Sequence, residues 1–265
     1  KVRAALEARY GLDKPLVAQY LDALKAFATL DLGTSLLHPD RGPITSSLRI
    51  PARRSLELGL WGFVVAVGFG LFLALAARSV RRPWERETIR ALSQIGLVLP
   101  VIALGPLLIE LFALRLGWLP PGGFTGARAR VLPAACLGLV YGAVFFHLFS
   151  GGLDDTAARP WPLLLQALGV RRRRVLLAHE LPASLGPFTS YLGPALSSLL
   201  TGSFVVERVF NIPGLSVVFV DAAHSRDYPV ILTIVLGYAL VLVSLNLLAE
   251  ALHAALDPRV RHGLA

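Results

Sequence analysis

The chain has 265 residues, of which 55% are hydrophobic and only 16% are charged. Soluble domains contain about 25% charged residues, so the composition excludes an ordinary soluble protein. The net charge of +9 is typical of nucleic-acid-binding proteins, but membrane proteins also collect Lys and Arg in their cytoplasmic loops. Because no aromatic platform accompanies the basic run Arg171 to Arg174, no nucleic acid is expected as a partner.

Residues 1–54 are predicted to form a segment on the external side of the membrane. Apolar side chains recur there at helical spacing: Leu16, Tyr20, Leu24 and Phe27. This spacing indicates a short amphipathic helix that ends near Leu32. We expect the helix to fold onto the membrane body, and Pro51 to turn the chain into the first span.

Five apolar segments follow, each with about the 20 residues that a helix needs to cross the hydrocarbon core. Unlike soluble core helices, they show no polar face every 3.6 residues. The predicted spans are 56–77, 92–114, 131–149, 188–206 and 230–252. A face of small residues on the fourth span, at Gly193, Ser197, Ser198 and Gly202, suits close helix packing. The sequence therefore predicts an all-α polytopic membrane protein with a transmembrane domain at 55–253.

Arginine residues set the predicted orientation. One set of loops contains Arg78, Arg81, Arg82, Arg86, Arg90, Arg159, Arg171 to Arg174, Arg259 and Arg261. The two opposite short loops contain only Arg115, Arg128, Arg130, Arg208 and Arg226. Since cytoplasmic loops are enriched in Arg and Lys, residues 154–187 form a cytoplasmic loop and residues 254–265 a cytoplasmic tail.

The loop 154–187 is long enough to need a partner or a role of its own. Its sequence predicts a short helix, a break at Gly169 and a second helix that ends near Pro182. These residues alone leave two interpretations open. The loop either docks a cytoplasmic subunit, or lies on the bilayer with Arg171 to Arg174 against anionic lipid headgroups.

Motifs spread over nearly the whole chain indicate a family. They are GLDKPLVAQYL at 11–21, DLGTS at 31–35, LGWLPPGG at 116–123, VVERVFNIPGL at 205–215, SRDYPVI at 225–231 and NLLAEALHAALDPRVR at 246–261. On these motifs the chain resembles the dipeptide/oligopeptide permease family of binding-protein-dependent ABC importers. The resemblance implies a type I importer transmembrane domain. Family members have an N-terminal span before the external segment, and we expect that this span is missing here.

The resemblance also implies which residues dock the ATPase. They are Leu164, Leu165, Gln166, Ala167, Leu168, Gly169, His179 and Pro187. Most polar positions of the family's docking helix are apolar here, with only Ala167 and Gly169 retained, so docking would depend more on burial of leucine side chains. Implied partners are a second homologous permease, two cytoplasmic ABC ATPases, a periplasmic substrate-binding protein and membrane lipid. The implied location is the bacterial inner membrane, as a multi-pass subunit.

No catalytic residue, metal or cofactor is expected on this chain. A GxxxxGK[ST] loop, which cradles nucleotide phosphates, is absent from the sequence, so ATP and Mg²⁺ are expected on the partner ATPases. The pair His179–Glu180 is weak evidence for a metal site, because further ligands are lacking. The implied cargo is a peptide or a related small solute, with nickel or another non-peptide solute as an alternative.

Other charged residues suggest further roles. Glu207, Arg208 and Asp227 are predicted at the external mouth, where they could contact the binding protein or a substrate terminus. Glu110, late in the second span, is an intramembrane carboxylate and hence a candidate functional residue. An ion-coupled secondary transporter would need paired charges at mid-membrane, and a membrane enzyme would need a catalytic constellation. The middle of each span is uncharged, and we find no such constellation in the sequence.

Overall fold

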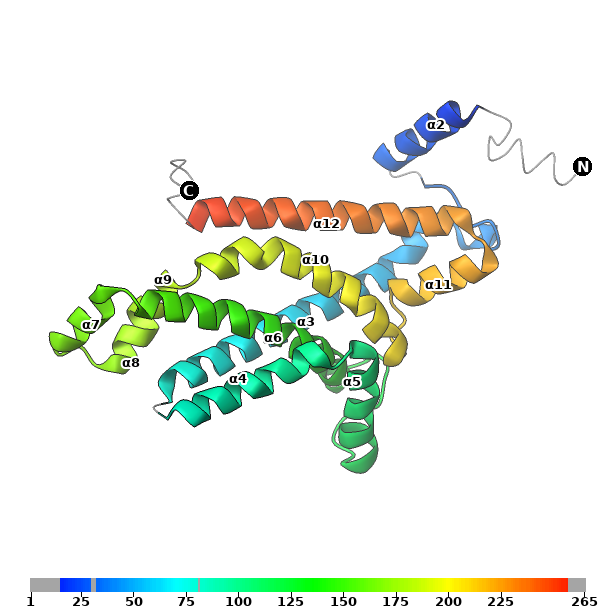
Figure 1. Ribbon diagram of the computed structural model, residues 1–265. Coiled ribbons are helices and arrows are strands. Elements are labelled where there is room, and N and C mark those ends of the chain that lie inside the picture. Colours follow the sequence, from blue (N-terminus) through cyan, green and yellow to red (C-terminus); the bar gives the residue numbers. More distant parts are fainter. Residues whose placement is uncertain (1–14, 30–31, 81, 257–265) are drawn as a thin grey trace, which may run out of the picture.

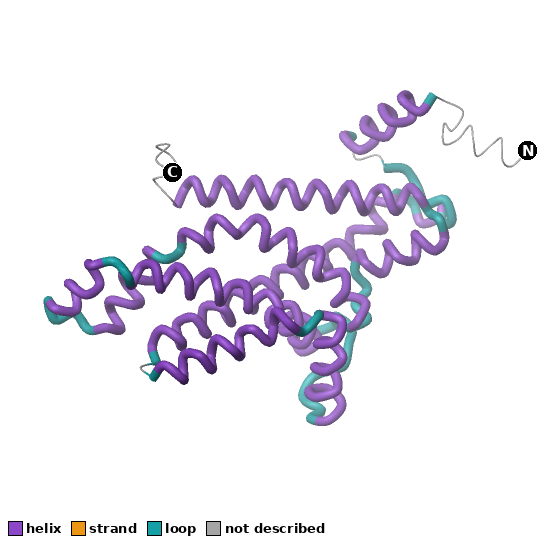
Figure 2. Tube along the Cα trace, viewed as in Figure 1, coloured by secondary structure: helices purple, strands orange, loops and turns teal. Residues whose placement is uncertain are grey.

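The computed structural model describes residues 15–29, 32–80 and 82–256. The start of the first motif, at 11–14, and the tail from residue 257 lie outside the described residues. Within the described ranges the chain is helical and forms no β-strand, only an isolated bridge between Thr34 and Pro43 (Figures 1 and 2). The predicted all-α fold class is therefore confirmed.

The helices follow one another with short connections. In chain order they are α2 (Leu16–Ala28), the 3-10 turn η1 (Pro39–Arg41), α3 (Ile44–Ser79), α4 (Pro83–Val98), α5 (Val101–Leu108), the π-helix η2 (Ile109–Arg115), α6 (Ala127–Ala157), α7 (Pro160–Ala167), α8 (Arg172–Val175), the π-helix η3 (Leu176–Glu180), α9 (Leu181–Ala183), α10 (Gly186–Val209), α11 (Leu215–Ser225) and α12 (Tyr228–Leu256).

Among the described residues, three helices are long and apolar enough to cross a membrane: α3, α6 and α12. The segment α4–η2 makes a fourth span only if its two parts are counted together, because they are bent by 106°. The predicted fourth span lies in α10, whose many Gly, Ser and Thr residues leave it outside this set. The predicted number of five spans is therefore not confirmed by length and apolarity.

Proline had a different effect from the one expected at two positions. Pro51 does not begin the first span, because α3 begins at Ile44 and continues through it. Because proline has no backbone N–H, the carbonyl of Ser47 has no intrahelical donor. Ser47 is exposed, so this carbonyl is not buried without a partner. By contrast, the predicted span 92–114 is broken at Pro100, which is extended (ψ 145°) and is the N-cap of α5. The residue before a proline is disfavoured in the helical conformation, so α4 ends at Val98.

The predicted third span is longer than expected, because α6 continues to Ala157. The predicted loop 154–187 therefore begins inside a helix. Asp154, in the additional turns, accepts hydrogen bonds from Arg86 and Arg90 of α4. These ion pairs place the end of α6 beside α4.

The external helix is present as α2, but it does not fold onto the membrane body as predicted. Its apolar residues Leu16, Val17 and Tyr20 are exposed, and α2 stands apart from the bundle in Figure 1. The side chain of Phe27 lies outside the described residues. The described part of α2 thus presents an uncovered apolar face.

The centre of the bundle is a close crossing of α3 and α6. A Cβ atom on Gly70 would lie 2.7 Å from Cβ of Phe145 and 2.8 Å from the carbonyl oxygen of Gly142. A Cβ atom on Gly142 would lie 2.8 Å from the ring of Phe69. Helices in membranes associate through such small-residue faces, because apolar burial gives little driving force in lipid. Backbone contact therefore joins α3 to α6.

The small-residue face of α10 contacts two neighbouring helices. Asn246 of α12 donates a hydrogen bond to Ser197 Oγ (3.0 Å), and the hydroxyl of Tyr141 on α6 donates to the Ser198 carbonyl (2.7 Å). Gly193 and Gly202 leave room for the same two side chains, Asn246 and Tyr141. This face consequently holds α10 between α6 and α12, as Figure 1 shows.

The two ends of the bundle differ. The turn between α3 and α4, the segment α7–α9 and the end of α12 lie together at one end, and α11 lies at the other with the beginnings of α3 and α12 (Figure 1). The loops predicted to be cytoplasmic thus share one end, which we call the inner end. The opposite end, with the predicted external loops, is called the outer end.

Candidate functional site

A helical hairpin, residues 160–183, projects from the inner end of the bundle (Figure 1). Pro160 and Pro162 lie in the first turn of α7, where the missing backbone donor has no intrahelical partner to lose. The helix ends in a Schellman motif: the Gly169 N–H donates to the Gln166 carbonyl and the Val170 N–H to the Leu165 carbonyl, both at 3.0 Å. Gly169 has φ +86°, which glycine adopts without strain.

The tip of the hairpin is an exposed leucine face. Leu163, Leu164 and Leu168 are 74%, 60% and 72% exposed. Four other predicted docking residues, Gln166, Ala167, Gly169 and His179, are exposed as well, and Leu165 is half-buried. Pro187 is exposed but lies in the first turn of α10, outside the hairpin. Large exposed apolar patches commonly mark interaction surfaces, so this face suits a partner.

The base of the hairpin is held firmly. Val175 and Leu176 are buried. Glu180 forms an ion pair with Arg78 at the end of α3 (3.3 Å), and Arg172 donates a hydrogen bond to the Arg78 carbonyl (3.3 Å). Sequence reasoning considered Glu180 only as a weak metal ligand. The ion pair joins residues that are 102 positions apart, so no local sequence pattern predicts it.

At the outer end, Glu207 is buried and anchors the loop between α10 and α11. Its Oε2 accepts a hydrogen bond from the Ser216 N–H (2.9 Å). The neighbouring Leu215 N–H donates to Ser55 Oγ on α3 (2.8 Å). A carboxylate beside the first backbone N–H groups of a helix also interacts favourably with the helix dipole. Glu207 therefore holds the beginning of α11, and it is not available to a partner in this conformation.

Asp227 is also buried, and it anchors the segment before α3. The carboxylate accepts hydrogen bonds from the Ser35 hydroxyl and from the Leu36 N–H (3.2 Å). Two of the motifs quoted above, DLGTS and SRDYPVI, thus meet in space. Of the three residues predicted at the external mouth, only Arg208 is exposed.

Replacing Glu207 with alanine is expected to destabilise the chain by about 1–3 kcal/mol, because the buried Ser216 N–H would lose its acceptor. The measurement is the thermal unfolding midpoint of the detergent-solubilised protein. The matched control is Glu110→Ala, since Glu110 is half-exposed and forms an ion pair with the exposed Arg115 (2.9 Å). Equal midpoints for the two variants would argue against the anchoring role.

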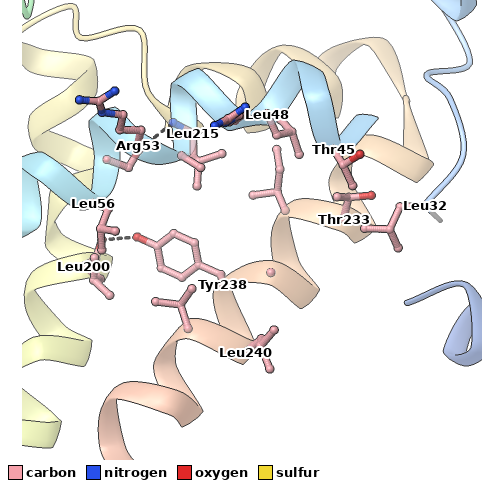
Figure 3. Close-up of a pocket in the computed structure, with 16 residues that line it drawn as sticks. Leu32, Thr45, Leu48, Arg53, Leu56, Leu200, Leu215, Thr233, Tyr238 and Leu240 are labelled. Carbon is pink, nitrogen blue, oxygen red and sulfur yellow. Dashed lines mark hydrogen bonds between the residues drawn. The ribbon is translucent and has the colours of Figure 1, made fainter. Parts of the chain in front are cut away.

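An apolar groove of about 410 Å³ lies between α3, α10 and α12 in the outer half of the bundle (Figure 3). Its lining includes Leu48, Leu200 and Tyr238, whose hydroxyl donates a hydrogen bond to the Leu200 carbonyl. Arg53 lies at its edge. No sequence motif predicted this groove, because its walls come from helices far apart in the chain.

Comparison with known proteins shows which family this chain belongs to. The family model for the binding-protein-dependent transport system inner membrane component matches residues 66–262. The oligopeptide transport system permease protein OppB of Haemophilus influenzae is 32% identical, over 99% of this chain and 86% of its own length. The dipeptide transport system permease protein DppB of Bacillus subtilis is 33% identical, over 98% and 84%. The glutathione transport system permease protein GsiC of Pectobacterium atrosepticum is 35% identical, over 95% and 82%.

Solved structures share the fold. A crystal structure of an amino acid ABC transporter with histidines matches with a TM-score of 0.62 at 17% identity, covering 80% of this chain and 94% of that chain. An inward-facing form of the MetNI methionine ABC transporter matches with a TM-score of 0.63 at 16% identity, covering 79% and 96%. The fold is therefore that of an ABC importer membrane domain. The chain belongs to the binding-protein-dependent inner membrane component family, among its dipeptide/oligopeptide permeases.

Proposed function

We propose that this chain is the permease subunit of an ATP-driven importer in the bacterial inner membrane. With a second homologous permease it forms the path for a peptide or peptide-like solute. A periplasmic binding protein delivers the solute, and two cytoplasmic ATPases bind ATP and Mg²⁺. Relatives named for oligopeptides, dipeptides and glutathione support this class of solute.

The observation that carries the proposal is the leucine face of the projecting hairpin. Burial of one leucine contributes about 1.5–3 kcal/mol, so Leu163, Leu164 and Leu168 provide enough apolar surface for a stable contact. The tip is exposed while the base is buried and ion-paired, so a force applied at the tip would reach the bundle. In this proposal the ATPases move the hairpin, and the hairpin moves the helices that enclose the path.

The proposal predicts that the tagged full chain, gently extracted from the membranes of its native host, brings down two ATPase subunits and a second permease. Within that complex, Gly169→Pro should separate ATP hydrolysis from uptake. Proline cannot adopt φ +86°, and it removes the N–H that donates to Gln166. The measurements are ATPase activity and uptake of a labelled tripeptide in proteoliposomes.

The matched control is Gly169→Asn, because asparagine tolerates the left-handed conformation better than other residues with side chains. This variant should retain most of the coupling. Recovery of the wild-type chain without any nucleotide-binding partner would contradict the proposed function. Unchanged uptake per ATP in Gly169→Pro would contradict the role given to the hairpin.

A further inference from the structure

Two long helices, α3 and α10, are connected to common neighbours at two levels of the bundle. At the inner end, Arg78 of α3 forms the ion pair with Glu180, which precedes α10 by a few residues. At the outer end, both helices hold the first turn of α11. Ser55 of α3 accepts from the Leu215 N–H, and Glu207 of α10 accepts from the Ser216 N–H.

The helical segments on the two sides have similar lengths. From Ser55 to Arg78 the rise is about 35 Å, at about 1.5 Å per residue. From Gly186 to Glu207 it is about 32 Å on the same scale. The arrangement is therefore a closed frame, with α3 and α10 as its two long sides, the hairpin base at one short side and the start of α11 at the other.

The sides of the frame differ in how they are attached to the hairpin. Helix α10 follows the hairpin in the chain, through α9, so it is linked covalently. Helix α3 is linked to the hairpin by non-covalent contacts. Arg78 pairs with Glu180 and accepts from Arg172. Ala74 and Ala77 share a buried apolar cluster with Leu176. The side chain of Glu180 is only 4% exposed, so water screens this ion pair weakly.

Stability alone gives little reason for a buried ion pair at this position. A buried ion pair gains little over an apolar pair of similar size, because desolvation opposes the electrostatic attraction. It does fix the relative position of its two partners. Glu180 is also the last residue of the π-helix η3, and π-helical turns occur frequently at functional sites.

We propose that the Arg78–Glu180 ion pair is the positioning contact that fixes the inner end of α3 to the hairpin, in addition to the packing of α3 on α6 and α10. The ATP-driven movement of the hairpin then reaches the first turn of α11, at the outer end, along both helices at once. This inference rests on the proposed coupling of the hairpin to ATPases. It adds a specific contact, the Arg78–Glu180 ion pair, and it predicts a response at the outer end that depends on this contact.

The experiment reports movement at the outer end without needing to know the solute. The buried Cys136 is replaced by alanine, and an environment-sensitive bimane label is attached to His224→Cys, an exposed position of α11. The assembled complex in proteoliposomes receives Mg-ATP and vanadate, and the change in bimane fluorescence is recorded. The chain with the native ion pair should respond clearly.

Arg78→Gln and Glu180→Gln should each reduce the response by roughly 2- to 30-fold, while ATP hydrolysis continues. The charge swap, Arg78→Glu with Glu180→Arg, should restore it. A purely structural role predicts instead that ATP hydrolysis and the response are lost together in the neutral variants. The control is Arg82→Gln, because Arg82 lies at the same end but is largely exposed and faces Glu85 at 3.9 Å. This control should respond like the chain with the native pair.

A single neutral substitution leaves one buried charge without its partner and can prevent folding. The apolar double variant, Arg78→Leu with Glu180→Leu, avoids this problem and should show the same reduced response. A full fluorescence response in that folded, ATP-hydrolysing variant would overturn the inference. The inference would also fail if the assembled complex with the native ion pair hydrolysed ATP without any response at His224→Cys. Failure of the native chain to assemble with ATPases would contradict the proposed function itself, and the inference with it.

Discussion

Replacing Gly70 with leucine is expected to prevent folding of the chain. Local helix propensity favours leucine over glycine by about 1 kcal/mol. Against this gain, the first side-chain atom alone would lie 2.8 Å from the Gly142 carbonyl oxygen and 2.8 Å from the Phe146 backbone nitrogen. Backbone atoms in the middle of α6 cannot move aside as a flexible side chain can, so the cost should exceed about 3 kcal/mol. The measurement is the yield of monodisperse protein after detergent extraction and size-exclusion chromatography.

The matched control for this prediction lies two residues away. Gly68 is on the same helix, and a Cβ atom there would meet nothing within 4 Å. Gly68→Leu should therefore be extracted in normal yield. Similar yields for the two variants would show that the crossing of α3 and α6 is looser than described.

The double variant Leu164→Glu with Leu168→Glu should lose the ATPase subunits while the permease still folds. Both side chains are exposed, so the substitutions leave the core untouched. Each leucine buried in a contact contributes about 1.5–3 kcal/mol, so affinity should fall on the order of 100-fold or more. Co-purification with the tagged chain, followed by quantitative gel analysis, measures the effect.

The matched control keeps the apolar surface. Leu164→Met with Leu168→Met retains volume and apolar character, and it should bring down the ATPases in normal amounts. If the glutamate variant also retained its ATPases, the contact would have to lie elsewhere on the inner end. The alternative interpretation, a hairpin on the bilayer surface, would then become the better one.

Much of the fold could be predicted from the sequence, for a physical reason. A backbone in lipid must satisfy its own hydrogen bonds, so a long apolar segment is nearly always a helix. The helix break at Pro100 was harder to predict from the sequence, because prolines such as Pro51 and Pro133 lie inside continuous helices. Whether a proline bends a helix depends on what its neighbours can satisfy, and this is a tertiary property.

The hairpin could also be predicted, because Gly169 and the prolines at 160 and 162 are local signals. The burial of the two carboxylates at the outer end could not be predicted in this way. The sequence shows Glu207 and Asp227 near loops, which suggested exposure, but their locations depend on Ser55, Ser216 and Ser35. Ser35 lies 192 residues from Asp227, and a hydrogen bond over such a separation leaves no periodic signal.

The backbone contact between α3 and α6 restricts how an importer of this kind can change shape. Around Gly70, Gly138 and Gly142 each helix fits into a notch of the other, so a slide by even one residue would drive side chains into backbone. The contact therefore opposes piston-like sliding of α3 against α6 in this conformation. Tilting of the two helices as one unit would keep this contact, and we expect the change in shape to occur in the connections on either side.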